Sequence, residues 1–149
     1  EGLFNILINE YDIEDLSVLD LFSGTGSISL EFASRGCTDI ISVEMNPMHA
    51  KFIKQVVQAY KVKGMQVVRH NAFDFIEICT KKFDIIFADP PYAIEGLDTI
   101  PDKIFEKQLL NPQGYLILEH PGTYNFEDHK YFVKERKYGN VHFSFFELK

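Results

Sequence analysis

Residues 17–36 of the chain read SVLDLFSGTGSISLEFASRG. The short apolar run at residues 17–22 is typical of a buried strand. Gly24 and Gly26 permit a tight turn at which the backbone can approach a ligand closely. Residues 27–34 have the pattern of a helix, which a glycine then ends. A strand, a glycine-rich turn and a helix in this order predict one βα unit of a parallel sheet.

The same alternation continues along the chain. Four further apolar runs have the length of strands, and helical patterns lie between them. The predicted strands span residues 17–22, 39–44, 65–70, 83–88 and 114–120, and the predicted helices span residues 2–11, 27–34, 47–62, 72–80 and 98–110. These cycles predict parallel pairing with helices on both faces of the sheet, because the crossovers are right-handed.

The end of the chain has a different pattern. Residues 130–139 and 140–149 alternate between apolar and polar side chains, and Gly139-Asn140 between them is a turn signal. The two segments predict a C-terminal antiparallel hairpin beside the parallel strands. We therefore expect a single α/β domain over residues 1–149, with a mostly parallel, doubly wound sheet of seven strands.

Composition limits the class of protein. The chain has 149 residues, 46% of them hydrophobic and 25% charged, as in one globular domain. No apolar run approaches the ~18 residues of a membrane span, and no signal peptide is visible. The two cysteines and five histidines lack the spacing of metal ligands. We expect a cytoplasmic protein, a monomer without a membrane or a metal as partner.

The charge distribution bears on nucleic-acid binding. A net charge of −7 argues against a nucleic-acid surface over the whole molecule. Basic residues nevertheless cluster near the end of the chain, at Lys130, Lys134, Arg136 and Lys137. They can contact RNA phosphates, and they can equally protect the exposed edge of the hairpin. Both interpretations stay open.

Ligands of open parallel sheets bind beyond the carboxyl ends of the strands. This rule selects four places in the chain, which are residues 20–26, Glu44, residues 71–72 and residues 89–92. Ser29 stands where a dinucleotide-binding fingerprint has its third glycine, so the sequence disfavours a pyrophosphate site.

Two of these places suit a nucleoside. Glu44 follows Asp20 by 24 residues, near the offset at which an acid accepts hydrogen bonds from ribose hydroxyls. A solvated side chain is the alternative for Glu44. Asn71-Ala72 offers a polar edge to an adenine ring, and the alternative role of Asn71 is to cap the next helix.

The run FDIIFADPPY, residues 83–92, ends a predicted strand on an acid, two prolines and a tyrosine. The prolines lack backbone donors and stiffen the segment, so its carbonyl groups are left as acceptors. A carboxylate and rigid carbonyls suit an amine with two N–H donors, and Tyr92 offers a flat face on which a base can stack. Such contacts position an amine for attack. A plain strand-ending turn is the alternative.

Four segments together carry a resemblance to a known family. They are EGLFNIL (1–7), VLDLFSGTGSISLEFASRG (18–36), FDIIFADPPY (83–92) and RKYGNVHFSFFEL (136–148). The chain resembles the bacterial 16S ribosomal RNA guanine-N2 methyltransferases, which are class I S-adenosylmethionine-dependent enzymes with a Rossmann-like fold. Members normally carry an N-terminal arm that is absent before Glu1, and the sequence opens without Met, so we expect upstream residues to be missing.

The resemblance implies a role for each motif. Gly24 and Gly26 border the methionine end of the cofactor, Glu44 holds its ribose, and Asn71, where members commonly have Asp, contacts its adenine. The residues expected to bind S-adenosylmethionine are Asp20, Phe22, Gly24, Gly26, Glu44, Met45, Asn71, Ala72 and Asp89. The residues expected to receive the target guanine and support catalysis are Asp89, Pro90, Pro91 and Tyr92.

The resemblance also implies the reaction. The expected enzyme moves a methyl group from S-adenosylmethionine to the N2 amine of a guanine in 16S ribosomal RNA, free or within the small ribosomal subunit. One alternative is an N-methyltransferase that acts on adenine or cytosine of DNA or of another RNA, because those bases also have an exocyclic amine. A module that binds the cofactor without catalysis is the other.

Overall fold

The computed structural model describes residues 2–148 and has one mixed sheet of seven strands. The strands are β1 (Val18–Leu21), β2 (Ile40–Glu44), β3 (Met65–Arg69), β4 (Phe83–Ala88), β5 (Leu110–His120), β6 (Phe132–Tyr138) and β7 (Val141–Phe146). Their order in the sheet is β3-β2-β1-β4-β5-β7-β6. The first five pair in parallel, and β7 is antiparallel to both β5 and β6. The fold predicted from the sequence is confirmed, while Glu1 and Lys149 lie outside the described residues.

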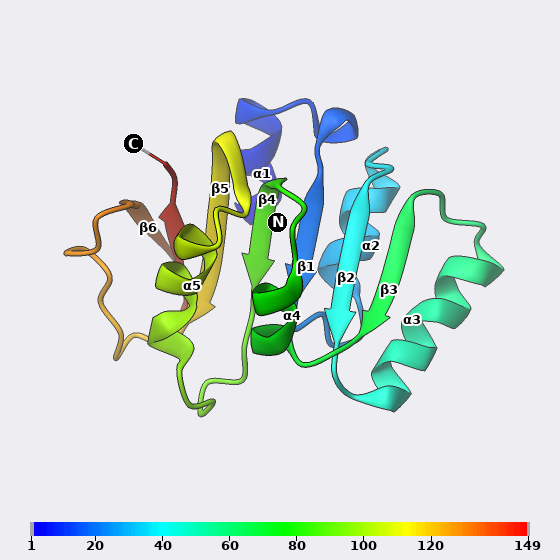
Figure 1. Cartoon of the computed structure of the whole chain (residues 1–149). Helices are drawn as coiled ribbons and strands as arrows, with labels where there is room; N and C mark the ends of the chain where they lie inside the picture. The colour runs from blue at the N-terminus through cyan, green and yellow to red at the C-terminus, as the bar shows by residue number, and fades with distance from the viewer. Residues whose placement is uncertain (1, 149) are drawn as a thin grey trace.

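Helices cover both faces of this sheet (Figure 1). They are α1 (Gly2–Glu10), α2 (Ser27–Ser34), α3 (Pro47–Ala59), α4 (Ala72–Ile78) and α5 (Ile100–Glu106), with short 3₁₀ turns η1 (Ile13–Asp15) and η2 (Leu97–Thr99). Helices α1, α2 and α3 contribute to one hydrophobic cluster, and α4 and α5 to the other. None of the helices within residues 2–148 combines the length and hydropathy that crossing a membrane requires.

The two clusters lie on opposite faces of the sheet because side chains alternate along a strand. Ile85 and Ile117 pack against α1 and α2, whereas their neighbours Ile86 and Leu118 pack against α4 and α5. All four are fully buried. Parallel strands buried on both faces have continuous apolar sequences, and this explains why the strands were evident from short apolar runs.

The register of the parallel strands brings their carboxyl ends level. Leu21 of β1 pairs with Val43 of β2 and with Ala88 of β4, and Ala88 in turn pairs with Leu118 of β5. The residues that follow these four positions therefore lie side by side at one edge. Phe22, Glu44, Asp89 and Glu119 are those residues.

The segment between α5 and β5 differs from the prediction. A helix was predicted over residues 98–110, but α5 ends at Glu106 and β5 begins at Leu110. Pairing with β4 starts this early because the Phe83 amide donates to the Leu109 carbonyl at 2.8 Å. The strand then continues through Asn111-Pro112, and the register shifts between Phe83 and Ile85. Proline is tolerated in such a strand at an irregularity.

Candidate functional site

A cavity of about 630 Å³, the first cavity, opens beyond the carboxyl ends of β1, β2, β3 and β4. Its lining includes every residue predicted from the sequence to form the site except Gly26. Those lining residues are Asp20, Phe22, Gly24, Glu44, Met45, Asn71, Ala72, Asp89, Pro90, Pro91 and Tyr92. Motifs up to 72 residues apart (92 − 20) therefore meet in one hollow.

The loop after β1 has a backbone that the glycines make accessible. Gly24 has φ 59° and Gly26 has φ 84°, and both values lie in the left-handed region. A Cβ at Gly26 would lie 3.0 Å from the Ile53 side chain, whereas one at Gly24 would meet open space. Gly26 thus shapes the loop from its buried side, and Gly24 faces the cavity. Phe22 holds φ 59° without being glycine, which is a strained conformation of the kind found at functional sites.

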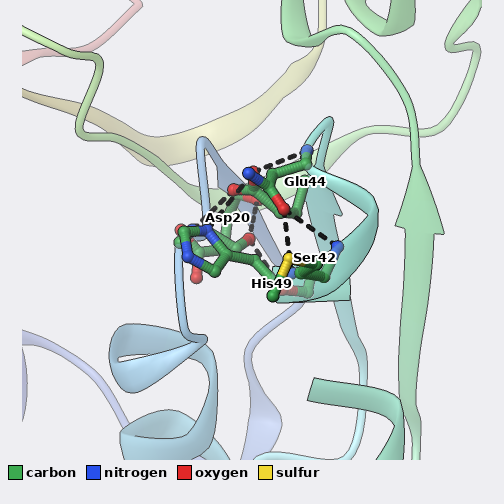
Figure 2. A network of polar contacts seen from close by, with 8 residues as sticks. Asp20, Ser42, Glu44 and His49 are labelled. Carbon is green, nitrogen blue, oxygen red and sulfur yellow. Dashed lines mark hydrogen bonds and ion pairs between the residues drawn. The ribbon is translucent and has the colours of Figure 1, made fainter. Parts of the chain in front are cut away.

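Glu44 joins this loop to the end of β2 (Figure 2). Its Oε1 accepts a hydrogen bond from the Gly24 amide at 2.7 Å, and its Oε2 accepts one from the Asn46 amide at 2.9 Å. The His49 Nδ1 atom lies 3.9 Å from the same Oε2. The side chain is 12% exposed, so it is not the solvated glutamate of the alternative interpretation. Each carboxylate oxygen retains a lone pair for a ligand.

Asp20 is the buried carboxyl beneath the loop. Its Oδ2 accepts hydrogen bonds from the Ser29 hydroxyl at 2.6 Å and from the Ser29 amide at 3.2 Å. Burial raises the pKa of Asp20 to about 7 despite these bonds. The serine that replaces the third glycine of a dinucleotide fingerprint therefore ties α2 to the end of β1. A direct contact between Asp20 and a cofactor stays a prediction.

A second set of polar contacts supports the same loop. The Ser42 hydroxyl donates to the Ser23 hydroxyl at 2.6 Å, and the Ser23 hydroxyl donates to the Asp20 carbonyl at 2.8 Å. Figure 2 shows Ser42 and Asp20 within this network, close to Glu44. The sequence pointed to neither hydroxyl as a support of the loop, because Ser42 lies within an apolar strand and Ser23 was considered only as a nucleophile and rejected.

Asn71 follows β3 and has the capping role that was considered for it. Its Oδ1 accepts from the Asp74 amide at 3.1 Å and so caps α4. Its Nδ2 is directed at the Met45 sulfur, 3.6 Å away, on the wall of the first cavity. The cap holds the amide group at the cavity, where Met45 is 61% exposed. An adenine contact by Asn71 stays a prediction.

The segment after β4 presents its acid and its aromatic ring outward. Asp89 is exposed, Pro90 is buried, and Tyr92 is 43% exposed. One of the expected free acceptors is not free, because the Pro91 carbonyl accepts from the Ile94 amide at 3.0 Å. The turn that this bond closes fixes the course of the chain after Pro91. The carboxylate of Asp89 is then the principal acceptor that this segment offers to the cavity.

A second cavity, also of about 630 Å³, lies on the other side of Asp89. It shares Ser27, Ile28, Phe87 and Asp89 with the first cavity. The remaining lining residues are Gly2, Leu3, Phe4, Glu31, Arg35, Glu119, Tyr138, Val141 and Phe143. From the sequence, Glu119 at the end of the fifth predicted strand could flank a substrate pocket, but a plain transition from strand to loop was the preferred interpretation. The only signal was its place at the end of a parallel strand.

Asp89 and Glu119 perturb each other. Asp89 keeps an exposed surface, but the surrounding protein still desolvates its carboxyl and so raises its pKa, while the Glu119 side chain opposes this rise. Burial, and then the charge of Asp89, raise the pKa of Glu119 to about 7. Neighbouring negative charges repel, so each carboxyl makes the other harder to ionise. Carboxyls perturbed in this way gather at functional sites.

The basic cluster of the hairpin is only partly free. Lys134 lies 3.4 Å from Glu10 and over the rings of Tyr115 and Phe145. Lys130, Arg136 and Lys137 are exposed. Because β6 is the edge strand of the sheet, protection of that edge is one role of the cluster. A contact with RNA phosphates stays a prediction for the exposed members.

Within residues 2–148, no group of three or more His, Cys, Asp or Glu side chains could hold a metal ion. Cys37 is buried and Cys79 is half-buried, and both are free thiols. The arrangement instead suits an organic ligand with hydroxyl and amine donors. Carboxylates and an amide line the first cavity beside apolar groups such as Val43 and Phe87, which is the usual make-up of a small-molecule site.

Comparisons with known proteins agree with this fold. The family model described as conserved hypothetical protein 95 matches residues 1–147. A relative in Buchnera aphidicola, named ribosomal RNA small subunit methyltransferase D, is 27% identical over 98% of this chain and 76% of its own length. The putative rRNA methyltransferase YlbH of Bacillus subtilis is 31% identical over 80% of this chain and 66% of its own. A solved conserved hypothetical protein of Streptococcus pyogenes superposes with a TM-score of 0.85 at 27% identity, covering 99% of this chain and 94% of that one.

Proposed function

We propose that this chain, which belongs to the conserved hypothetical protein 95 family, transfers a methyl group from S-adenosylmethionine to the N2 amine of a guanine in 16S ribosomal RNA. The membership bears out the methyltransferase family inferred from the sequence motifs. S-adenosylmethionine is the cofactor of that class of enzyme, as in solved structures of the same fold. The single observation that carries the proposal is the position of Asp89, whose carboxylate lies on the wall between two cavities.

The first cavity fits S-adenosylmethionine in size and chemistry. Its volume of about 630 Å³ lies within the usual range for small-molecule sites. Glu44 would accept hydrogen bonds from the vicinal ribose hydroxyls, since both of its oxygens keep a lone pair. Met45 and the Asn71 amide would lie along the adenine. The backbone at Gly24, where no side chain intervenes, would border the methionine end.

Asp89 and Tyr92 would hold the methyl acceptor. The cofactor supplies an electrophilic methyl group bound to a positively charged sulfur. Asp89 would accept a hydrogen bond from the exocyclic amine and so align its nitrogen with the methyl carbon. The exposed ring of Tyr92 offers a stacking surface for the base. Pro90, buried below, keeps the carboxylate at a fixed place.

The transfer needs no covalent bond to the protein. S-adenosylmethionine would supply the methyl group and leave as a neutral thioether, while the amine nitrogen would gain the methyl carbon and lose one proton. Asp89 would hold that nitrogen, and its carboxylate is the nearest proposed acceptor of the proton. The proton passes to solvent through the open side of the site, where Asp89 is exposed.

The names of the two relatives support an RNA substrate, because both are rRNA methyltransferases by description. The exposed Lys130, Arg136 and Lys137 would contact phosphates near the target nucleotide. A monomeric state and a cytoplasmic location stay predictions.

The test uses full-length protein with isotopically labelled S-adenosylmethionine. Small ribosomal subunits, naked 16S RNA and duplex DNA are each incubated with it, digested to nucleosides and analysed by mass spectrometry. We expect label in N2-methylguanosine from one of the two RNA substrates. Label in N6-methyladenosine or N4-methylcytosine instead would replace the proposal with the adenine or cytosine alternative. Cofactor binding without any transfer would identify a binding module.

A further inference from the structure

The proposed mechanism leaves Glu119 without a role. Glu119 is the penultimate residue of β5, directly beside the end of β4 in the sheet. Ala88 pairs with Leu118, so Asp89 and Glu119 occupy the next matching positions of two adjacent parallel strands. Both line the second cavity, and only Asp89 also lines the first.

The two carboxyl groups lie on the same face of the sheet. Phe87 and Ile117 of the same strands belong to the cluster on the α1 and α2 face, and alternation directs Asp89 and Glu119 toward that face as well. Each carboxyl acts on the other, since the charge of Asp89 contributes to the raised pKa of Glu119. Tyr92 lies within their influence, since burial and then the charges of Glu119 and Asp89 raise its pKa.

We propose that Glu119 determines base specificity by accepting a hydrogen bond from the N1–H group of the target guanine, while Asp89 accepts one from the neighbouring N2 amine. This inference rests on the proposed function. Guanine carries two adjacent donors on this edge of the ring. Adenine and cytosine carry an amine beside an unprotonated ring nitrogen, which is an acceptor and would face the Glu119 carboxylate without a proton between them. Two ionised carboxylates therefore select guanine, whereas a pair that keeps one proton would suit adenine or cytosine.

Without a ligand, the Asp89 and Glu119 carboxyls repel each other, and a base with two N–H donors reduces this repulsion. Two adjacent carboxylates repel, and the raised pKa values of Asp89 and Glu119 show that ionising both groups is costly in the free protein. A base edge with two N–H donors supplies one hydrogen bond to each carboxylate and so favours the state in which both groups are ionised. Neither carboxyl has another charged partner in the described part of the chain that would neutralise it first.

The second cavity has room and walls for a purine. Its volume is about 630 Å³, and it continues into the first cavity through the shared Asp89. Tyr138, which is 39% exposed, and Phe143 contribute aromatic surface to its lining, and aromatic rings bind unstacked bases through their faces. A base whose edge meets Asp89 from this side presents its amine toward the first cavity.

The test pairs a protein change with a ligand change. Guanosine and 1-methylguanosine, which lacks the N1–H donor, are titrated into full-length protein saturated with S-adenosylhomocysteine, and binding is followed by NMR. We expect Glu119→Ala to lower the affinity for guanosine about tenfold or more, as for the loss of a hydrogen bond to a charged group. The affinity for 1-methylguanosine should not change. Equal losses for both nucleosides, no loss for either, or no binding of guanosine by the wild-type protein would overturn the inference.

Two controls separate this result from other causes. Glu106→Ala removes an exposed glutamate at the end of α5, which lines neither cavity, and should leave both affinities unchanged. An unchanged affinity of Glu119→Ala for S-adenosylhomocysteine shows that the variant is folded. The proposed function is judged separately by methyl transfer to RNA in the wild-type protein. Guanine methylation that survives Glu119→Ala with its base preference intact overturns the inference alone.

Discussion

The two sides of Asp89 are organised in opposite ways. On the side of the first cavity, acidic side chains are already held by the protein, since Glu44 accepts from two backbone amides and Asp20 accepts twice from Ser29. On the side of the second cavity, Asp89 and Glu119 have only each other. The groups on the first side are thus already held in place by the protein. The carboxyls on the second side are available to accept hydrogen bonds from a ligand.

This difference corresponds to two tasks. A loop fixed by internal hydrogen bonds does not have to be ordered when a ligand binds, so less of the binding free energy is lost. A carboxylate that has no other partner can stabilise the transition state through its contact with the reacting group. We expect changes on the first side to alter cofactor affinity and stability, and changes on the second side to alter transfer.

Removal of the Asp89 carboxylate should have the largest effect. Asp89→Ala removes the acceptor that aligns the amine, and losses of one such group lower turnover by roughly 100- to 1000-fold. Affinity for S-adenosylmethionine should change by less than about threefold, because the groups around the loop and Glu44 remain. Single-turnover transfer measured beside calorimetric titration of the cofactor checks both expectations.

A loss of cofactor affinity equal to the loss of transfer would contradict the separation of the two sides. Asp89→Asn is the matched variant, because it keeps one acceptor oxygen at nearly the same volume. The turnover of Asp89→Asn should lie between that of the wild type and that of Asp89→Ala. Turnover of Asp89→Ala within tenfold of the wild type would remove the proposed role of the carboxylate.

The buried carboxyl of Asp20 should make stability depend on pH. Its pKa is about 7 in the folded protein and near 3.8 in the unfolded chain. Between these values the folded state keeps a proton that the unfolded state has lost, so the free energy of unfolding falls as pH rises from about 4 to about 7 and then levels off. Between pH 5 and pH 8 this group should lower stability by on the order of 2–3 kcal/mol.

Asp20→Asn isolates this contribution because the amide does not titrate. Urea denaturation of both proteins at pH 5, 6, 7 and 8 gives the difference in unfolding free energy at each pH. The wild type should lose stability relative to Asp20→Asn as pH rises. A difference that stays constant over this range would show that Asp20 is ionised throughout and that the Ser29 contacts offset its burial.

The parts of the molecule that were predictable depend on short stretches of sequence. The strand, glycine turn and helix of residues 17–36 have local signals, and the D-P-P-Y segment carries its own chemistry. Glu119 has no such signal, because its importance follows from the pairing of Ala88 with Leu118, residues 30 positions apart (118 − 88). The register of a parallel sheet places residues side by side that are far apart in the sequence, and the sequence alone does not show these pairs.

The same reason explains the errors at β5. The residues from 107 to 113 have a composition suited to the end of a helix and a turn, and pairing with β4 overrides it. Gly114 permits this pairing, because a Cβ there would lie 2.6 Å from the Asp84 carbonyl oxygen. The interpretation of Ser29 as unsuited to a dinucleotide loop stays a prediction. Its hydrogen bond to the buried Asp20 became visible only in three dimensions.

A substitution of Glu44 should have the smallest effect, and it tests the side of the first cavity most selectively. Glu44→Gln keeps the side-chain length and one acceptor for the Gly24 amide. It places an amide NH₂ opposite the Asn46 amide, which is itself a donor, and so loses that contact and the negative charge. We expect S-adenosylmethionine to bind about tenfold more weakly, in line with one charged hydrogen bond, with turnover at saturating cofactor within about twofold of the wild type. A lowered turnover at saturation with unchanged affinity would mean that Glu44 acts on the reaction itself, and the division between the two sides of Asp89 would then not hold.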